Sequence, residues 1–318
     1  MNSGNSESIF LHRRINEQFY VEERIDSGGM ADVYKAIDLR TDQWVALKVC
    51  ANGKGFTSFE KEIKLLRSLS HPNIQRILLN GVYQGLPYYV MPLYENLNFR
   101  QFLDAKDTLP ERDILFFFTQ ITDAVSYLHA HRIIHNDLKP QNILVAKNEL
   151  LFLGDFGLAQ RCRKSISRKS KKNTIWGSPV YLAPELASGK TQSFSSDVYS
   201  LGIILFILYL GYPPFFHDDL DSLISMHQAM PVPLPRQTNP SITQEIQSII
   251  LKSLAKRPQE RYRNAQQLHT SILQYWKTNK DTIDQVSIPR YPHIPSHQHK
   301  TRRIIKEAAK DAGCSKIK

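Results

Sequence analysis

The sequence predicts an α+β fold of two parts: a small antiparallel sheet with one main helix, followed by a larger and mostly helical part. Two observations carry this prediction. Short runs of alternating apolar and polar residues dominate residues 19–93, whereas longer runs with apolar residues at helical spacing dominate the chain from there to about residue 279. With 318 residues, of which 42% are apolar, the chain is globular in composition and long enough for roughly two domains of about 100–200 residues each.

The N-terminal part is predicted to be a sheet interrupted by one helix. Glycine-containing turns separate short runs typical of strands, which cover residues 19–25, 32–38, 44–50, 74–79 and 88–93. A helix is predicted over residues 59–69, where apolar residues recur at helical spacing and a His-Pro pair lies just beyond the end. Residues 1–18, before the first strand, form a polar leader in this interpretation.

The C-terminal part is predicted to be built around a long and mostly apolar helix over residues 114–131. Two short strand-like runs, 143–146 and 150–153, follow it and flank polar loops. Further helices are expected over residues 195–210, 220–228, 244–255 and 265–278.

These elements predict one domain at residues 19–279 with two lobes, an N-lobe at about 19–92 and a C-lobe at about 95–279. Residues 280–318 form a basic tail that contains Pro and His. The most apolar segment, residues 202–210, is about half as long as a membrane span, so we expect a buried helix and no membrane span.

The positive charge of the chain is local. The formal net charge is +11, and residues 161–172 hold seven Lys/Arg and no acidic residue, while residues 300–318 hold a net charge of +5. Because these segments account for the whole excess, nucleic-acid binding by the fold itself is disfavoured. The basic loop at 161–172 is equally well explained as a binding site for an acidic partner or as a solvated loop.

The N-terminus and the cysteines predict a reducing compartment. No apolar run bounded by a cleavage site opens the sequence, which argues against a secretory signal. The three cysteines are far apart and odd in number, so neither a disulfide framework nor a zinc site is expected. We expect a cytoplasmic protein, with delivery into a host cell as an alternative that the sequence leaves open.

The segment H-N-D-L-K-P-Q-N at residues 135–142 carries the most specific chemistry of the chain. It places a carboxylate (Asp137), an ammonium (Lys139) and a carboxamide (Asn142) on one short loop, and a second carboxylate, Asp155, follows downstream. Phosphoryl transfer requires these groups: a base to orient a hydroxyl, a cation for the moving phosphoryl group, and two ligands for Mg²⁺. Each residue alone could be a turn or cap residue, but the four at this spacing predict catalysis.

A glycine-containing turn over residues 26–33 (DSGGMADV) is a candidate phosphate contact. Ser27, Gly28 and Gly29 form its centre, where glycine lets backbone amides approach phosphate oxygens. Alone, the turn is better explained as a plain hairpin. Its place between two predicted strands, with V-A-L-K following, favours the phosphate contact.

Lys48 ends the apolar run of V-A-L-K, where a lone lysine is usually a solvated edge charge. Two glutamates on the next predicted helix, Glu60 and Glu62, are candidate partners for its ammonium group. We favour Glu62, because the leucines of that helix then pack inward beside it.

From about Phe19 to Ser271 the sequence resembles a eukaryotic-like (Hanks-type) Ser/Thr protein kinase, and the run SGGMADVYKA is most similar to bacterial members. The other landmarks follow in order: D-F-G at 155–157, G-S-P-V-Y-L-A-P-E at 177–185, S-D-V-Y-S-L-G at 196–202 and G-Y-P-P-F at 211–215. The resemblance implies a bilobal protein-kinase-like fold.

The resemblance also implies a site for ATP with Mg²⁺, or with Mn²⁺ in its place. By this resemblance Val33, Ala46 and Leu144 enclose the adenine, Met91 guards the back of the pocket, and Leu93 lies in the hinge. Lys48, paired with Glu62, contacts the phosphates, as does the turn. The implied nucleotide-binding residues are Ser27, Gly28, Gly29, Val33, Ala46, Lys48, Met91, Leu93, Leu144 and Asp155.

The implied catalytic residues are Asp137 as the base and Lys139 as the neutralising cation, with Lys48 and Glu62, and the implied metal ligands are Asn142 and Asp155. Two further roles implied by the resemblance are structural: Glu185 and Arg261 form an ion pair, and Asp197 anchors the catalytic loop.

The expected activity is transfer of the γ-phosphoryl group of ATP to Ser/Thr hydroxyls of proteins. Lys139 and the Ser178-Pro179 pair resemble Ser/Thr kinases and not tyrosine kinases. The alternative is a pseudokinase-like scaffold or binding module, which Asp26 and Ala31 favour because they replace the outer glycines of the turn. The substrate, the upstream signal and the oligomeric state stay open.

One residue departs from the family pattern. Most protein kinases have Arg where this chain has Asn136, and that Arg pairs with a phosphorylated activation loop. An Asn side chain cannot form the charge-assisted pair. We therefore predict a non-RD kinase whose activity does not require phosphorylation of its loop.

Overall fold

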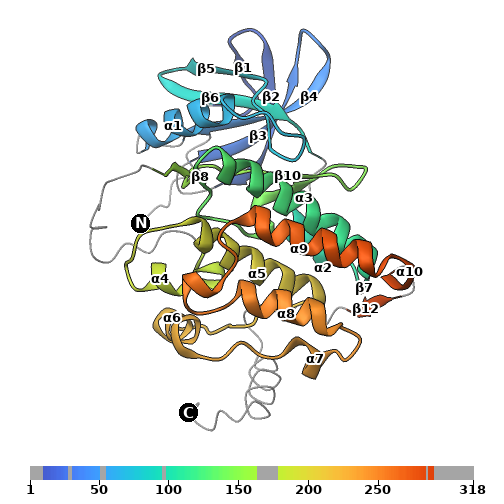
Figure 1. The fold of residues 1–318 in the computed structure, drawn as a ribbon. Coiled ribbons are helices and arrows are strands. Elements are labelled where there is room, and N and C mark those ends of the chain that lie inside the picture. The colour runs from blue at the N-terminus through green and yellow to red at the C-terminus, as the bar shows by residue number, and fades with distance from the viewer. Residues whose placement is uncertain are drawn as a thin grey trace. The chain divides into compact units, whose positions relative to one another are not determined.

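The fold is made of two compact units (Figure 1), in a computed structural model that describes residues 10–27, 31–50, 55–94, 98–162, 178–283 and 286–289. The first unit comprises Met1–Leu97 and Val145–Gly157, and the second comprises Asn98–Leu144 and Leu158–Lys318. A sheet dominates the first unit and helices dominate the second. The predicted α+β class with a smaller sheet part and a larger helical part is confirmed.

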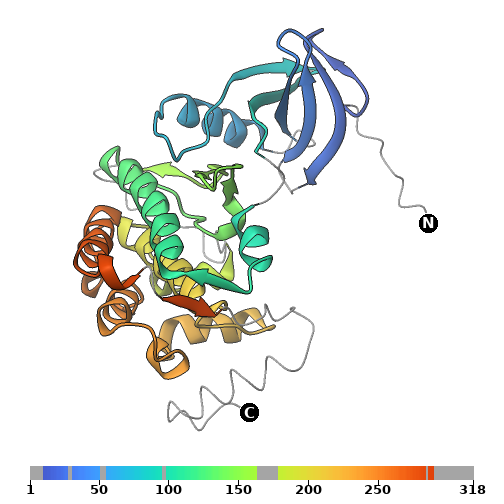
Figure 2. The ribbon, with the colours of Figure 1, turned by 90° about the vertical axis from the view of Figure 1, so that its right-hand side faces the viewer.

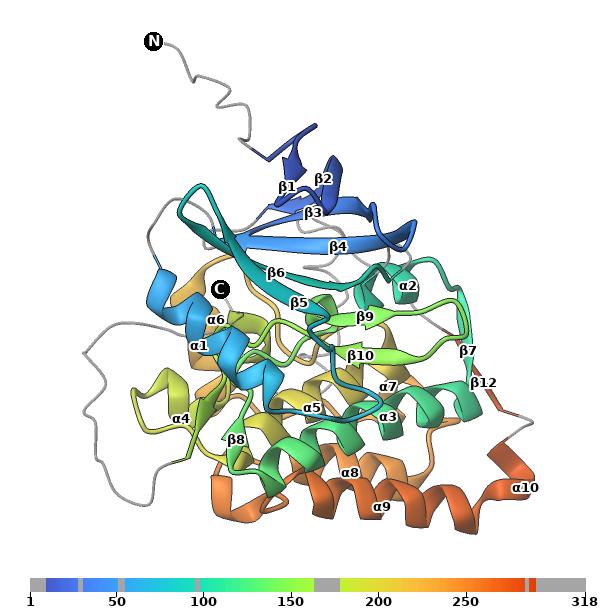
Figure 3. The same cartoon turned by 90° about the horizontal axis from the view of Figure 1, so that it is seen from above.

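A six-stranded antiparallel sheet dominates the described part of the first unit, with strand order β1-β2-β3-β4-β6-β5 (Figure 3). The helix α1 (Phe56–Arg67) packs against β6 and buries the side of the helix that contains Phe59 and Glu62. The strands are β1 (Arg14–Ile15), β2 (Phe19–Ser27), β3 (Ala31–Asp38), β4 (Gln43–Cys50), β5 (Leu79–Tyr83) and β6 (Leu86–Pro92).

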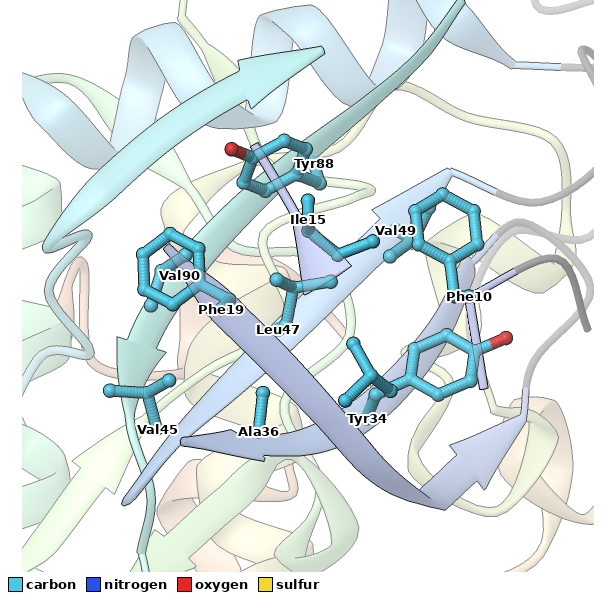
Figure 4. Close-up of a cluster of buried hydrophobic side chains, with 11 residues drawn as sticks. Phe10, Ile15, Phe19, Tyr34, Ala36, Val45, Leu47, Val49, Tyr88 and Val90 are labelled. Atoms are coloured by element: carbon cyan, nitrogen blue, oxygen red, sulfur yellow. The ribbon is translucent and has the colours of Figure 1, made fainter. Parts of the chain in front are cut away.

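The core of this sheet begins before residue 19, so the predicted polar leader is too long. Phe10 and Ile15 are buried at 2% and 0% exposure, and β1 pairs with β2 through Ile15 and Phe19. The ring of Phe10 stacks on Tyr34 at 5.9 Å between centroids (Figure 4). Phe10 lies in a run of only three apolar residues and Ile15 stands alone among polar ones, so neither shows a strand or helix periodicity. The eleven residues of the cluster are Phe10, Ile15, Phe19, Val21, Tyr34, Ala36, Val45, Leu47, Val49, Tyr88 and Val90.

The strand predicted at 74–79 is wrong for most of its length. Strand β5 lies at Leu79–Tyr83, and the turn that follows it is formed by Gln84 and Gly85, both with positive φ (49° and 80°). The Asn-Gly pair that suggested a turn lies inside β5. A Cβ on Gly81 would meet the Tyr88 hydroxyl at 2.8 Å, so this glycine allows a side chain to approach the backbone and makes no turn.

Residues 145–157 belong to the first unit, although the predicted boundary near residue 95 assigned them to the second. Strand β9 (Ile143–Val145) leads into this segment and β10 (Leu151–Leu153) lies within it. The amide of Gln75 donates to the carbonyl of Leu153 at 2.9 Å, and Asn73 Nδ2 donates to the carbonyl of Leu151 at 2.9 Å. These bonds join segments far apart in the sequence, which hydrophobic periodicity cannot predict.

The second unit is organised around α5 (Phe194–Leu210), which is buried over almost its whole length. Helix α3 (Glu111–Ala130) packs against both α9 and α5. Gly202 of α5 allows close packing, since a Cβ there would lie 2.8 Å from the Cβ of Ser253. The other helices are α2 (Phe99–Asp104), α4 (Pro184–Ala187), α6 (Leu220–Ala229), α7 (Pro235–Thr238), α8 (Gln244–Ser253), α9 (Ala265–Thr278) and α10 (Lys280–Ile283), with short 3₁₀ turns η1 (Pro140–Asn142), η2 (Pro179–Tyr181) and η3 (Pro258–Glu260).

Two short strand pairs, which we did not predict, complete the second unit. Strand β7 (Thr108–Pro110) pairs with β12 (Ser287–Pro289) (Figure 2), and β8 (Ile133–Ile134) pairs with β11 (Gln160–Arg161). The first pair corrects the predicted domain end at 279, because Ile288 is fully buried in the fold. The remaining tail, 290–318, lies outside the described residues. None of the helices in the described ranges combines the length and apolarity that crossing a membrane requires.

Candidate active site

The first unit brings together Lys48, Glu62 and Asp155. Lys48 Nζ lies 2.8 Å from Glu62 Oε1 and 3.4 Å from Asp155 Oδ1. The side chains of Lys48 and Glu62 are 14% and 4% exposed, whereas that of Asp155 is 48% exposed. The competing candidate, Glu60, is exposed on α1. The structure therefore places Glu62 as the partner of the lysine and leaves a half-exposed carboxylate beside the pair.

The negative charges beside Lys48 hold this lysine in its protonated form. Burial alone would lower the pKa of Lys48, but the nearby charges, including those of Glu62 and Asp155, outweigh it and raise the pKa well above the usual value. One ammonium and two carboxylates leave this cluster with an excess negative charge. Such a cluster attracts a further cation while keeping a fixed positive group for an anion.

The nucleotide-binding residues predicted in the first unit lie on or next to its sheet. Ala46 and Met91 are register partners on β4 and β6, and both are buried. Gln75 Nε2 donates to Met91 Sδ. Val33 is the register partner of Lys48 and, like Leu93 just beyond β6, is partly buried.

Four other predicted nucleotide contacts divide between the turn and the second unit. Ser27 ends β2, and its amide donates to Asp26 Oδ1 at 2.8 Å. Gly28 and Gly29 lie outside the described residues. Leu144 belongs to the second unit, where it forms an isolated bridge with Asn98.

The second unit brings together Asp137, Lys139, Asn142 and Ser178. Asp137 Oδ2 accepts hydrogen bonds from Lys139 Nζ at 2.8 Å and from Asn142 Nδ2 at 2.9 Å. Asp137 Oδ1 accepts a bond from the amide of Ser178 at 3.1 Å, and Lys139 Nζ also donates to Ser178 Oγ at 2.9 Å. Donors therefore fix both oxygens of the candidate base, and one of them is a cation.

Asp197 holds the start of this loop from α5, as predicted. Its carboxylate is 1% exposed and accepts from the amides of His135 and Asn136 at 2.9 and 3.0 Å. His129 Nε2 also bonds to it at 2.9 Å, while His129 Nδ1 accepts from the amide of Ala265 at 3.0 Å. Because Nδ1 accepts, the proton that faces Asp197 is on Nε2.

Asn136 takes a left-handed backbone conformation, with φ of 68°, which Asn adopts more readily than most residues. Its Nδ2 donates to the carbonyl of Leu158 at 2.9 Å. The side chain thus connects the loop at residues 135–142 to the segment that follows D-F-G. Its neutral amide makes a bond there that needs no charged partner.

Glu185 and Arg261 form the ion pair that the family resemblance implies. Arg261 Nη1 and Nη2 donate to Glu185 Oε1 and Oε2 at 2.9 and 2.8 Å. Burial would raise the pKa of Glu185, but hydrogen bonds and charge from Arg261 outweigh it and lower the pKa below its usual value. This pair lies in the second unit and is structural.

The candidate ligands for magnesium have suitable donor atoms in each unit. Asp155 of the first unit offers a half-exposed carboxylate. In the second unit, both hydrogen bonds of the Asn142 side chain are donated by Nδ2, so its amide oxygen is the atom suited to a cation. Carboxylate and amide oxygens are the ligands that Mg²⁺ prefers, so both residues fit the ion.

Sequence reasoning missed two contacts of the site. The hydroxyl of Tyr89 donates to Glu62 Oε1 at 2.9 Å, and the Asn136 side chain reaches the carbonyl of Leu158. The signal for Tyr89 is a hydroxyl in an otherwise apolar strand, which needs a buried partner. No signal in the sequence identifies a bond to a backbone carbonyl 22 residues away.

Comparison with known proteins identifies the family. Residues 19–273 match the protein kinase domain. The chain is 34% identical to the serine/threonine-protein kinase PrkC of Bacillus subtilis over 96% of this chain and 47% of the relative. It is 32% identical to a probable serine/threonine-protein kinase PknB of Lactococcus lactis, over 80% of this chain and 42% of that relative. PknB of Mycolicibacterium smegmatis is 28% identical over 95% of this chain and 49% of its own length.

The chain thus spans about half the length of these curated relatives. Their shared serine/threonine-protein kinase names agree with the resemblance that the catalytic motifs carried, and the match covers both units. The chain belongs to the protein kinase family.

Proposed function

We propose that this chain transfers the γ-phosphoryl group of ATP to Ser/Thr hydroxyls of proteins. The observation that carries the proposal is the network around Asp137, whose two carboxylate oxygens accept from Lys139, Asn142 and the amide of Ser178. A base held in this way, beside a cation, suits transfer to a hydroxyl.

The first unit supplies the groups for the nucleotide. Lys48, kept protonated and oriented by Glu62, would bind the α/β-phosphates as a fixed cation. Asp155 is a candidate ligand for Mg²⁺, or for Mn²⁺ in its place, and Asn142 is a candidate ligand in the second unit. The metal ion, when bound, neutralises phosphate charge.

The second unit supplies the groups for the hydroxyl. Asp137 would accept or orient the hydroxyl proton, and its bond from the amide of Ser178 fixes the direction in which the carboxylate points. Lys139 lies between Asp137 and Ser178 and would neutralise charge that develops on the transferred phosphoryl group. This arrangement favours an active kinase over the scaffold alternative.

Radiolabel transfer from ATP to a generic Ser/Thr-containing protein tests the activity, with Asp137→Asn as the matched control. We expect phosphoserine or phosphothreonine from the wild type and a loss of about 10²–10⁴-fold in rate in the variant, because a positioned base contributes that much. The carboxamide of the variant keeps the size of the side chain, and the melting temperature of the variant shows whether the fold is retained. Equal incorporation by both proteins, or none by the wild type, would favour the scaffold.

We further propose that activity does not depend on phosphorylation of the loop. Both flanks of residues 163–177 are bonded to the catalytic loop by unmodified groups. On one flank, Asn136 bonds to Leu158 and the amide of Cys162 donates to the carbonyl of Arg132 at 2.6 Å. On the other flank, Ser178 bonds to both Asp137 and Lys139.

A variant without the loop hydroxyls tests this second proposal. Its four substitutions, at positions outside the described residues, are Ser165→Ala, Ser167→Ala, Ser170→Ala and Thr174→Ala. We expect its kcat/KM to stay within about threefold of wild type, since each removed group lacks the usual arginine partner. Abolished activity in a variant that melts at the wild-type temperature would contradict the proposal.

The basic loop at 161–172 keeps its two interpretations, an acidic partner or a solvated loop. Arg161 is exposed, and residues 163–172 lie outside the described part of the chain. Competition by an acidic peptide for substrate phosphorylation, with a scrambled basic peptide as control, distinguishes them.

A further inference from the structure

Tyr89 of β6 lies against both members of the Lys48–Glu62 pair. It is the register partner of Lys48, across β4 and β6, and is 1% exposed. Its hydroxyl donates to Glu62 Oε1 at 2.9 Å, which is the same oxygen that accepts from Lys48 Nζ at 2.8 Å. One carboxylate oxygen therefore accepts two hydrogen bonds, from side chains on two strands of the sheet.

The ring of Tyr89 holds α1 at a second point. Its centroid lies 5.5 Å from that of Phe59, which is buried on α1. Phe59 and Glu62 are three residues apart, so they occupy the same side of the helix on successive turns. Tyr89 thus contacts α1 through its ring on one turn and through its hydroxyl on the next.

The chemistry of the hydroxyl suits a fixed donor. Burial, the largest influence, raises the pKa of Tyr89 far above its usual value, so the phenol keeps its proton at any physiological pH. A neutral donor on a charged acceptor makes a stronger bond than one between neutral groups. The bond also leaves the charge balance of Lys48, Glu62 and Asp155 unchanged.

We propose that Tyr89 is a positioning residue that keeps Glu62 on Lys48 and so keeps the lysine ready for nucleotide phosphates. The inference rests on the proposed kinase function and adds a device within the first unit to it. Without the hydroxyl, Glu62 keeps a single donor on Oε1 among those described, and Lys48 is freer to turn toward Asp155, 3.4 Å away.

The substitution Tyr89→Phe tests the proposal, because it removes the hydroxyl and keeps the ring against Phe59. The matched control is Tyr88→Phe. Tyr88 is the adjacent residue of β6, equally buried at 1% exposure, and its hydroxyl accepts from Asn16 Nδ2 at 2.8 Å. Both variants lose one buried hydroxyl and its hydrogen bond, but only Tyr89→Phe alters the contact with Glu62.

We expect Tyr89→Phe to lower kcat/KM for ATP by about tenfold, the size of one hydrogen bond to a charged group, and Tyr88→Phe to change it by less than about twofold. Both should lose thermal stability, and Tyr89→Phe should lose at least as much as Tyr88→Phe. Equal kinetic losses in the two variants would mean that Tyr89 has only a packing role and would overturn the proposal.

A double-mutant cycle with Glu62→Ala measures the coupling directly. We expect the effect of Tyr89→Phe on the affinity for MgATP to vanish in the Glu62→Ala background, because its acceptor is then absent. An undiminished effect in that background would overturn the proposal.

Amide hydrogen exchange of residues 56–67 separates this proposal from the proposed function, since it needs no activity. Faster exchange of α1 in Tyr89→Phe than in Tyr88→Phe supports the positioning role even in a chain that transfers no phosphate. Equal exchange in the two variants contradicts it, whatever the activity of the wild type.

Discussion

Two buried ion pairs, one in each unit, are built differently. The Lys48–Glu62 pair of the first unit has Asp155 beside it, and the side chain of Asp155 is 48% exposed. The Glu185–Arg261 pair of the second unit is closed, with side-chain exposures of 5% and 0%. The first has a second, half-exposed carboxylate beside its cation, and the second pair is buried on both sides.

The donors of Arg261 explain why its pair is closed. Nε donates to the carbonyl of Ala255, and Nη1 and Nη2 donate to the Glu185 oxygens and to two further carbonyls, so all five N–H groups of the guanidinium are used. Because no N–H group of this arginine is left to donate to a ligand, the pair is suited to stabilising the fold and not to binding. Excess charge and exposure are therefore the features that set the proposed nucleotide-binding cluster apart from the closed pair.

Opening the closed pair should give the largest effect. We expect Arg261→Ala to lower the free energy of unfolding by about 3–5 kcal/mol, because it leaves the buried carboxylate of Glu185 without its cation. Chemical denaturation measures the loss. Arg257→Ala is the control, since Arg257 is 74% exposed and its pair with Glu260 at 3.6 Å should contribute about 0–1 kcal/mol. Similar losses in both variants would remove the distinction.

Neutralising the open cluster should affect activity and hardly affect stability. We expect Asp155→Asn to reduce kcat by about 10²–10³-fold, the range for losing one group that stabilises charge during transfer. Its melting temperature should stay close to wild type, because an ion pair of a half-exposed carboxylate at 3.4 Å from its cation contributes little to folding.

Asp38→Asn is the control for this prediction. Asp38 is a partly buried carboxylate of the same unit, on β3, and accepts from Gln18. It should keep wild-type activity. An Asp155→Asn protein that unfolds as readily as Arg261→Ala would show that the open cluster is structural as well.

The stability of the second unit around the Glu185–Arg261 pair should also depend on pH in a defined window. His227 contacts Tyr199 there, and burial, with repulsion from Lys256, lowers its pKa from 6.5 to about 3. Between these values the unfolded chain binds a proton that the folded chain does not, so stability falls as the pH drops below about 6.5.

From pH 7 to pH 5 this single group should remove about 2 kcal/mol. Denaturation of the wild type and His227→Gln at several pH values isolates the contribution, because all other titrating groups are common to both. The variant should lose less stability than the wild type over this range. Parallel curves for the two proteins would place the acid sensitivity elsewhere.

Local patterns were sufficient for the regular elements of the fold. The helix predicted at 265–278 coincides with α9, and the strand predicted at 44–50 lacks only Gln43. Predictions failed at strands of two or three residues, as at Ile15 in β1 and Ile288 in β12, and the second of these pairs with a strand far away in the sequence. The Asn80-Gly81 pair suggested a turn, but Gly81 lies inside β5 and allows close packing against Tyr88.

In the candidate site, likewise, some features could be predicted from the sequence and others could not. Motif spacing identified Lys48, Asp137 and Asp155, because their chemistry requires particular residue types at particular intervals. It did not identify the contacts that hold them, such as the Tyr89 hydroxyl on Glu62, since a tyrosine in a strand has many uses. Whether an ion pair is open or closed depends on burial and donor geometry, and only the structure gives these.

Unmodified residues assemble the catalytic site in the proposed kinase. The most direct measurement is the time course of substrate phosphorylation by protein that phosphatase treatment and intact mass have shown to be unphosphorylated, with the phosphatase removed. We predict a linear course from the first turnovers, because Asn136, Ser178 and Lys139 already hold the loop ends. A lag that shortens as the protein phosphorylates itself, and disappears with prior autophosphorylation, would contradict the account.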